Sequence, residues 1–381
     1  MHILIAPNAF KNSLTAWEVA QAIEKGLKQS KLTCTCECFP IADGGDGTAG
    51  LIIKKFDGNR ITKKVRDPLG RIISSSFGLI DDGHTAVIEM ADASGLRLLN
   101  EDELDPLLAT TFGTGELIKL ALDEGVSRII IGLGGSATVD GGIGIVKALG
   151  ARFLNSEDEE LLDMPKSLVY LNKIDLSGLD PRVFDCDITV LCDVDNKLLG
   201  SMGAAAVFGP QKGASSEGVL KLEASLSKLR NVALKETGRD MGAVVSGGAA
   251  GGSAAGLYAF LNATIVNGAE YFLKLTGFEE SLKISDLVIT GEGSIDEQTM
   301  LGKGPYAVAL MAKKRNLAVI GLAGKVPMKE NESLRQYFDV LMAIGHGPTD
   351  IATAMQFTVD NLIRTSCEMG NLLAFAKKIN I

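Results

Sequence analysis

The chain has 381 residues, of which 46 % are hydrophobic and 22 % are charged. This length exceeds what one ordinary hydrophobic core accommodates, so the sequence predicts two domains. The net charge of −9, without a long run of Lys and Arg, argues against nucleic acid and anionic membranes as partners. Composition leaves the oligomeric state open.

Cysteine and histidine argue against a zinc site. Cys34, Cys36 and Cys38 alternate, so on a strand they share one face, and the whole chain holds only three histidines. We expect reduced thiols and a cytoplasmic location. The apolar run 3–6 is too short for a signal peptide. Residues 241–269 carry no charge, but their paired glycines argue against a membrane span.

Five short apolar segments are typical of buried parallel strands, and most precede a helical pattern. They are residues 2–6, 33–42, 286–290, 318–323 and 340–344. Thr15 and Glu18 form a capping box for the first helix, and Pro305 begins another. Two of these units lie near the start of the chain and three near its end. The sequence therefore predicts one doubly wound sheet from residues 1–60 and 283–381.

The middle of the chain, residues 61–282, has a different pattern and predicts an inserted mixed α/β domain. Residues 72–80 and 85–90 are predicted to form a hairpin around Asp81-Asp82-Gly83. Residues 128–131 and 188–191 are predicted strands that end in glycine-rich or acidic turns. Residues 254–266 are predicted to form a helix.

Glycine-rich turns are candidates for phosphate binding. The chain has 44 glycines, a content well above the average of about 7 %. Backbone N–H groups in such turns between strand and helix hold anions, although tight turns need glycine in any case. No Walker A sequence occurs, and the loose dinucleotide fingerprint near residue 132 lacks its acidic partner. The candidate residues are Gly134, Gly135, Ser136, Thr138, Gly248, Gly251, Gly252, Gly291 and Gly293.

Acidic residues gather where predicted strands end. They are Asp43, Asp46, Asp193, Asp195, Glu292 and Asp296. Such acids are candidate magnesium ligands or general bases, and the alternative is that each only caps the next helix. In a doubly wound sheet, ligands bind at the carboxyl ends of the strands. A phosphate cradle, a metal, a cation and a base at one edge together predict phosphoryl transfer.

Seven segments in family order resemble the glycerate kinase family. They are residues 6–14, 42–48, 134–142, 192–196, 206–213, 248–252 and 291–299, the last followed by Gly302-Lys303. The resemblance implies a flavodoxin-like domain built from both termini, an inserted α/β domain, D-glycerate as substrate and Mg²⁺-ATP as phosphoryl donor. It favours phosphorylation at position 2. The chain departs from the family at Asn8-Ala9, where Asp-Ser is usual, and at Val139, where Asn is usual.

Site roles follow from the residues and from the resemblance together. Asp43 follows the second strand and precedes two glycines, so we expect it to act as the base, with Asp296 or Glu292 as rivals. Lys11 is expected to stabilise the charge that develops on the phosphoryl group, and Asp296 and Lys303 are further catalytic candidates. Asp193, Asp195 and Glu292 are the magnesium candidates.

The substrate's carboxylate needs a local cation in this acidic protein. Arg66 and Arg71 are candidates because a guanidinium binds a carboxylate through two hydrogen bonds, and the alternative is a solvated hairpin arm. Ser13, in a matching segment, is a further candidate for substrate binding. The alternative function is a non-catalytic two-domain protein that binds a small carboxylate.

Overall fold

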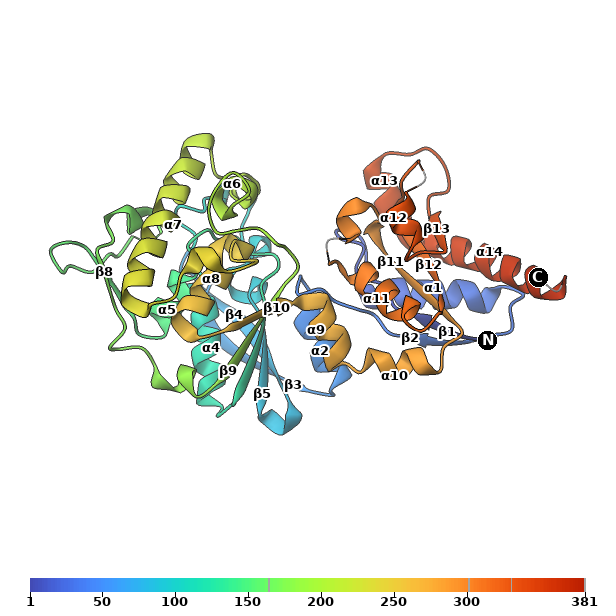
Figure 1. Ribbon diagram of the computed structural model, residues 1–381, viewed down its shortest axis with the longest axis horizontal. Coiled ribbons are helices and arrows are strands. Elements are labelled where there is room, and N and C mark those ends of the chain that lie inside the picture. The colour runs from blue at the N-terminus through green and yellow to red at the C-terminus, as the bar shows by residue number, and fades with distance from the viewer. Residues whose placement is uncertain (164, 301, 330, 380–381) are drawn as a thin grey trace. The chain divides into compact units, whose positions relative to one another are not determined.

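The computed structural model describes residues 1–163, 165–300, 302–329 and 331–379. The chain divides into two compact units. The first unit combines Met1–Asp43 with Ala269–Ile381, and the second is Gly44–Gly268. Each unit contains a β-sheet with helices packed on it, so the protein has the predicted α/β fold class (Figure 1).

The first unit is built on a five-stranded parallel sheet in the order β2-β1-β11-β12-β13. Its strands are β1 (His2–Ile5), β2 (Thr35–Cys38), β11 (Leu287–Ser294), β12 (Ala318–Lys325) and β13 (Val340–Ala343). All five segments predicted to be parallel strands contribute to this sheet. Numbered within the unit, the order is 2-1-3-4-5, which is the flavodoxin-like order.

Helices cover both faces of the first sheet. Ile3 and Ile5 pack against α1 (Ala16–Gln29) and α14 (Thr358–Lys378), whereas Leu4 points to the opposite face because side chains alternate along a strand. Helix α11 (Gly304–Lys313) packs against β11 and β12. The predicted capping box is present, with Thr15 and Glu18 bonded to each other's backbone. The shorter helices are α9 (Gly268–Leu275), α10 (Phe278–Lys283), α12 (Glu332–Arg335) and α13 (Ile351–Gln356).

The unit boundaries lie at 43/44 and 268/269, which differs from the boundaries near 60 and 283 that the strand pattern of the sequence predicts. Helix α2 (Thr48–Lys55) belongs to the second unit because it packs on β4 and β5, where Ile53 fills the space beside Gly78. Helix α10 belongs to the first unit. Its Phe278 meets Phe39 edge to face, with ring centroids 5.0 Å apart, and Ser281 donates a hydrogen bond to Glu37.

The second unit contains a six-stranded mixed sheet in the order β10-β9-β6-β5-β4-β3. Its strands are β3 (Asn59–Arg66), β4 (Ile72–Ile80), β5 (Thr85–Glu89), β6 (Arg128–Gly132), β9 (Asp187–Cys192) and β10 (Thr264–Asn267). The hairpin β4–β5 is present as predicted, with Asp81–Gly83 between its strands. β5, β6, β9 and β10 run parallel, so their carboxyl ends meet at one edge. A two-stranded sheet joins β7 (Arg152–Leu154) and β8 (Lys173–Asp175).

One face of this sheet carries a large apolar core under helices α4, α5, α7 and α8, and α2 packs against β4 and β5. The helices of the unit are α2, α3 (Ala91–Ser94), α4 (Phe112–Asp123), α5 (Ile143–Ala148), α6 (Ala204–Phe208), α7 (Ser216–Thr237) and α8 (Ala249–Leu261).

The helix predicted over 254–266 is wrong at its end. Asn262 adopts a left-handed conformation that terminates α8, and the β-branched run 264–266 pairs with β9 instead.

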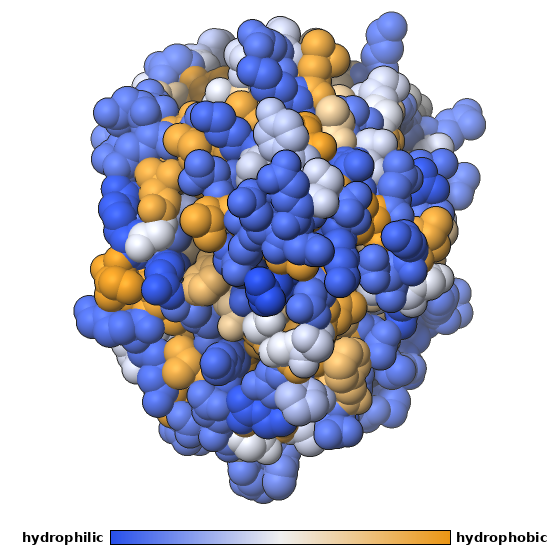
Figure 2. Space-filling view, turned by 90° about the vertical axis from the view of Figure 1, so that its left-hand side faces the viewer, coloured by the Kyte–Doolittle hydropathy of each residue, from blue (hydrophilic) through white to orange (hydrophobic). Residues whose placement is uncertain are grey.

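The surface is largely polar where Figure 2 shows it, with apolar side chains scattered among charged ones. Among the described residues, no helix combines the length and the apolar character that crossing a bilayer requires.

Two glycines of β11 have different environments, which gives a matched test of this fold. A Cβ on Gly291 would lie 2.0 Å from the carbonyl oxygen of Leu322 in β12, whereas a Cβ on Gly293 would have its nearest neighbour 4.0 Å away. We expect Gly291→Ala to lower the free energy of unfolding by about 2 kcal/mol or more. Gly293→Ala should change it by less than about 0.5 kcal/mol. Urea unfolding followed by circular dichroism measures both, and equal effects would contradict the described β11–β12 packing.

Candidate functional site

A polar cluster lies at the carboxyl ends of the strands in the first unit. We call Asn8, Lys11, Asp43, Glu292, Thr299 and Lys303 the first-unit cluster. The parallel ladder extends beyond β1, because Asn8 N–H donates to Gly291 O (2.8 Å) and Ile41 N–H donates to Pro7 O (3.0 Å). This backbone pairing brings the segments that follow β1 and β2 beside the end of β11.

Asn8 holds Asp43 by a direct hydrogen bond. Its amide Nδ2 donates to Asp43 Oδ2 at 2.8 Å, while its own Oδ1 accepts the backbone N–H of Ala9. Both side chains are buried. The Asn8 amide therefore fixes the orientation of the carboxylate expected to be the base, a role that its departure from the family's usual residue does not predict.

Glu292 is the second buried carboxylate of the first-unit cluster. Thr299 donates to its Oε1 at 2.9 Å. Burial raises the pKa of Glu292, and the negative charge of Asp43 acts in the same direction, whereas Lys303, Thr299 and Lys11 lower it. Two acids and two lysines thus interact at one edge of the sheet. Such a set can bind an anionic substrate and accept a proton from it.

Other candidates in the first unit make structural contacts. Asp296 accepts a hydrogen bond from Ser294 at 3.2 Å, and its backbone N–H donates to Thr299, at the start of a short helical turn. Ser13 donates to the carbonyl of Met355 and to Thr358 Oγ1, which ties it to the start of α14. These bonds favour positioning roles for both residues.

Three predicted loops meet in the second unit. A Cβ on Gly251 would lie 2.0 Å from the carbonyl oxygen of Thr138, and Gly248 N–H donates to Asn196 O at 2.8 Å. The glycine-rich stretches after β6 and at the start of α8 therefore contact each other and the turn after β9. Gly252 lies against Leu198. Most of these glycines are required by close backbone packing.

The segment 134–138, which we call the β6 loop, follows the end of β6. Gly134 packs on Gly45, and a Cβ on Gly135 would lie 2.2 Å from Asp46 Oδ1. Gly135 is exposed, whereas Ser136 and Thr138 are buried. Within the described part of the chain, Thr138 Oγ1 has no hydrogen-bond partner. A buried hydroxyl is normally bonded, so the β6 loop has unused hydrogen-bonding capacity.

Asp193 and Asp195 directly follow β9, with Asp193 half-buried and Asp195 exposed. Among the described residues, no three His, Cys, Asp or Glu side chains lie close enough to form a protein-only metal cage. Magnesium is commonly held by one or two carboxylates together with phosphate oxygens of the substrate. A carboxylate pair at a strand end fits that mode of binding.

Glu89 is a buried acid that is not among the site residues predicted from the sequence. It ends β5, and its carboxylate accepts the backbone N–H groups of Gly47 (2.6 Å) and Ala49 (3.3 Å), so it caps the start of α2. Burial raises the pKa of Glu89 to about 7, with Asp92 and Asp46 acting in the same direction and the Gly47 N–H and Arg97 opposing them. An acid at the end of an apolar strand was the signal in the sequence that could have identified it.

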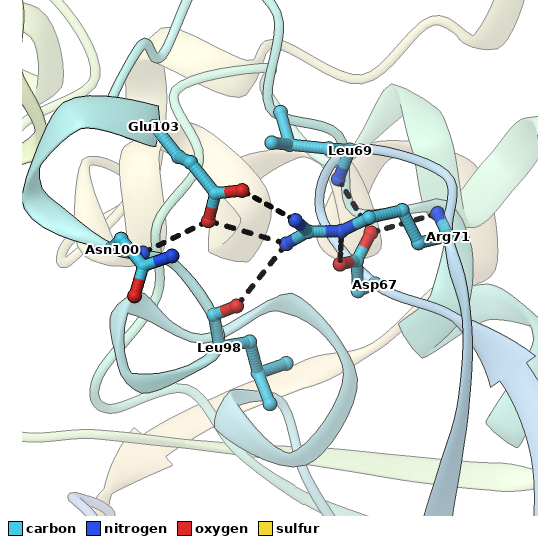
Figure 3. Close-up of polar contacts among 6 residues, drawn as sticks. All are labelled: Asp67, Leu69, Arg71, Leu98, Asn100 and Glu103. Carbon is cyan, nitrogen blue, oxygen red and sulfur yellow. Dashed lines mark hydrogen bonds and ion pairs between the residues drawn. The ribbon is translucent and has the colours of Figure 1, made fainter.

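Arg66 and Arg71 are engaged with carboxylates of the second unit. Arg66 forms an ion pair with Glu116, which also accepts the backbone N–H of Arg66. Figure 3 shows the guanidinium of Arg71 between Asp67 and Glu103, with the carbonyl of Leu98 beside it. Because internal acids already neutralise both cations, these contacts favour the structural alternative. A role in binding the substrate's carboxylate stays a prediction.

The fold and the two sets of polar loops define a class: a two-unit α/β enzyme with a flavodoxin-like sheet and an inserted α/β unit. The model of the glycerate kinase family matches residues 3–374. The chain belongs to the glycerate kinase family, and it is a kinase, as the resemblance implied.

Named relatives support this membership across nearly the whole chain. The chain is 42 % identical over 377 residues to a glycerate kinase of Bacillus subtilis (strain 168), covering 99 % of each. It is 44 % identical over 382 residues to a glycerate 2-kinase of Escherichia coli (strain K12), again covering 99 % of each. A crystal structure from Salmonella typhimurium LT2 that bears the provisional name glycerate kinase 2 is 40 % identical, with a TM-score of 0.84 over 99 % of both chains.

The raised pKa of Glu89 predicts a specific dependence of stability on pH. The folded protein keeps a proton on Glu89 up to about pH 7, whereas the unfolded chain releases it near the ordinary glutamate pKa of 4.5. Folding therefore binds a proton in this interval, and the stability that Glu89 contributes falls as the pH rises from 4.5 to 7. The expected loss is about 3 kcal/mol.

Glu89→Gln retains an acceptor for the N–H groups of α2 and removes the titration. Between pH 4.5 and pH 8, we expect the unfolding free energy of the wild type to fall by about 3 kcal/mol more than that of Glu89→Gln. Urea denaturation at several pH values measures it. A difference that does not change with pH would show that Glu89 titrates normally.

Proposed function

We propose that this enzyme transfers the γ-phosphoryl group of Mg²⁺-ATP to a hydroxyl of D-glycerate and releases ADP. The observation that carries the proposal is the first-unit cluster, in which a buried and oriented carboxylate interacts with a second acid and two lysines. The family supplies the substrate class, because several matched relatives are named for glycerate phosphorylation. The alternative of a non-catalytic carboxylate binder is not favoured.

Asp43 is proposed to accept the proton of the attacking hydroxyl. An alkyl hydroxyl attacks phosphorus poorly unless its proton has an acceptor and its oxygen is held in line. Asn8 bonds one oxygen of Asp43 and fixes the plane of the carboxylate. Lys11 and Lys303 are proposed to stabilise the charge that develops on the phosphoryl group. Glu292 and Asp296 remain rival candidates for the base.

The β6 loop and the glycines at the start of α8 that contact it, Gly248, Gly251 and Gly252, are proposed to bind the nucleotide phosphates. Their support is the exposed Gly135 backbone and the Thr138 hydroxyl, which lacks a partner among the described residues. Val139 is fully buried, so it serves the core and the loop acts through its backbone and hydroxyl groups. Asp193 and Asp195 are proposed to bind magnesium, which would neutralise phosphate charge.

Phosphorylation at position 2 is favoured because one relative, from Escherichia coli, is named a glycerate 2-kinase. Since ATP is the proposed co-substrate, we place the reaction in the cytoplasm. A coupled assay of ADP release with D-glycerate tests the activity, and phosphorus NMR of the product distinguishes 2-phosphoglycerate from 3-phosphoglycerate. ADP formation that does not depend on glycerate would overturn the proposal.

Substitution of the proposed base should lower turnover without disturbing the fold. Asp43→Asn is nearly isosteric, and we expect kcat to fall by about 10²–10⁴, equivalent to roughly 3–5 kcal/mol. Affinity for ATP should stay close to that of the wild type. Steady-state kinetics at saturating magnesium measure both quantities.

The rival assignments are tested with Glu292→Gln and Asp296→Asn under the same conditions. If either of these variants loses kcat by that order while Asp43→Asn stays within a few-fold of wild type, Asp43 is not the base.

The magnesium assignment predicts a change in metal requirement. Asp193→Asn removes a charged ligand but keeps an oxygen, so we expect the magnesium concentration at half-maximal activity to rise about tenfold or more. Asp195→Asn, at the more exposed position, provides the matched comparison. Magnesium titration at fixed ATP measures this, and two unchanged titrations would remove these aspartates from the metal site.

A further inference from the structure

Lys212 is a buried lysine with no role in the function proposed above. It lies in the short helical turn Pro210–Lys212 of the second unit and is only 3 % exposed. Its Nζ donates to Ser136 Oγ and to the carbonyl oxygen of Thr138, both at 2.8 Å. An ammonium group is costly to bury unless it is bonded, and both of these acceptors belong to the β6 loop.

A buried aspartate fixes the chain just after the same loop. Asp140 is fully buried and accepts hydrogen bonds from Thr111 and from the backbone N–H groups of Gly142 and Gly144. Burial lowers the pKa of Lys212 to about 7, and the charge of Asp140 opposes that shift. The two groups that bond the ammonium, the Ser136 hydroxyl and the Thr138 carbonyl, are uncharged. Lys212 therefore gains or loses its charge near neutral pH.

We propose that Lys212 is a positioning residue that holds the β6 loop and, through its buried positive charge, favours the binding of nucleotide phosphate to that loop. This inference rests on the proposed assignment of the β6 loop to the nucleotide. Charge interactions are stronger in the interior than in water, so an ammonium bonded to the loop favours an anion bound there. Exposed Gly135, next to Ser136, is the part of the loop that a phosphate can reach.

The competing explanation is a lysine that only completes the packing of the second unit. The two explanations differ in proton linkage. If a phosphate interacts with the Lys212 charge, binding raises the pKa of Lys212, and the ammonium takes a proton from the buffer. A lysine with a purely structural role does not change its protonation when the nucleotide binds.

Calorimetry of ADP binding in two buffers of different ionisation enthalpy measures this proton uptake. At pH 8, where the nucleotide phosphates are already ionised, a rise of one to two units in the pKa of Lys212 predicts uptake of about 0.4 to 0.8 proton per ADP. At pH 6, Lys212 is already charged and contributes almost no uptake, so the proton exchange measured there comes from the nucleotide phosphate and should be the same with and without the Lys212 charge. The affinity for ADP should fall as the pH rises above 7.

Lys212→Met retains the length of the side chain and removes its charge. We expect this variant to lose the uptake at pH 8 and to bind ADP about tenfold more weakly at pH 6, with the KM for glycerate nearly unchanged. The matched control is Lys147→Met. Lys147 is a lysine of the same unit whose contacts are the Leu161 carbonyl and Glu160, and this variant should behave as the wild type. If Lys212→Met does not fold, Lys212→Gln removes the charge while it keeps hydrogen-bond donors.

The outcomes separate the two proposals. An uptake that is absent in the wild type, or equal in the wild type and the charge-free variant, overturns the role of Lys212 even if the enzyme phosphorylates glycerate. A wild-type enzyme that binds ADP with the predicted uptake but does not phosphorylate glycerate would instead refute the proposed reaction.

Discussion

The parallel pairing of β1 with β11 is the constraint on which the rest of the structure depends. It joins residues 3–5 to residues 287–289, so segments near the two ends of the chain share one sheet, and residues 44–268 are inserted in the sequence of the first unit as a second unit. Ile3, Leu4 and Ile5 are fully buried, which makes this register the apolar centre of the first unit. The same ladder continues to the bond between Asn8 and Gly291, so the pairing that builds the core also places Asn8, Asp43 and Glu292 together.

The sequence predicted the first unit well because its signals are local. Short apolar runs, each bounded by a turn, identified all five strands, and a capping box identified the start of α1. The unit boundaries differed because they depend on long-range packing. Residues 44–60 contain a helix and part of a strand, and nothing local shows that Ile53 packs on Gly78. The end of α8 was likewise decided by strand pairing with β9.

The sequence predicted which loops form the candidate site better than it predicted which side chains act there. Glycine-rich turns and terminal acids identified the loops. Tertiary packing decides whether a glycine is needed for ligand binding or for contact with a neighbouring strand. A side chain at Gly291 would clash with the carbonyl of Leu322, whereas Gly293 faces open space. The same limit applies to Arg71, whose partner Glu103 lies on a different segment. Asn8, Glu89 and Lys212 were missed because their importance comes from burial and from distant partners.

Buried ionisable groups at the carboxyl edge of the second sheet give a physical reason to regard that edge as functional. Glu89, Asp140 and Lys212 are each buried, and desolvation is the largest influence on the pKa of each. Apolar residues of similar volume would often hold a core as well or better, so such groups are weak contributors to stability. Each of them instead bonds the backbone of a glycine-containing loop: Glu89 at Gly47, Asp140 at Gly142 and Gly144, and Lys212 at Thr138. Their common effect is to fix loops that glycine would otherwise leave conformationally free. A rigid arrangement of backbone donors is what phosphate recognition requires, and a loss of stability accepted for that purpose is typical of functional sites.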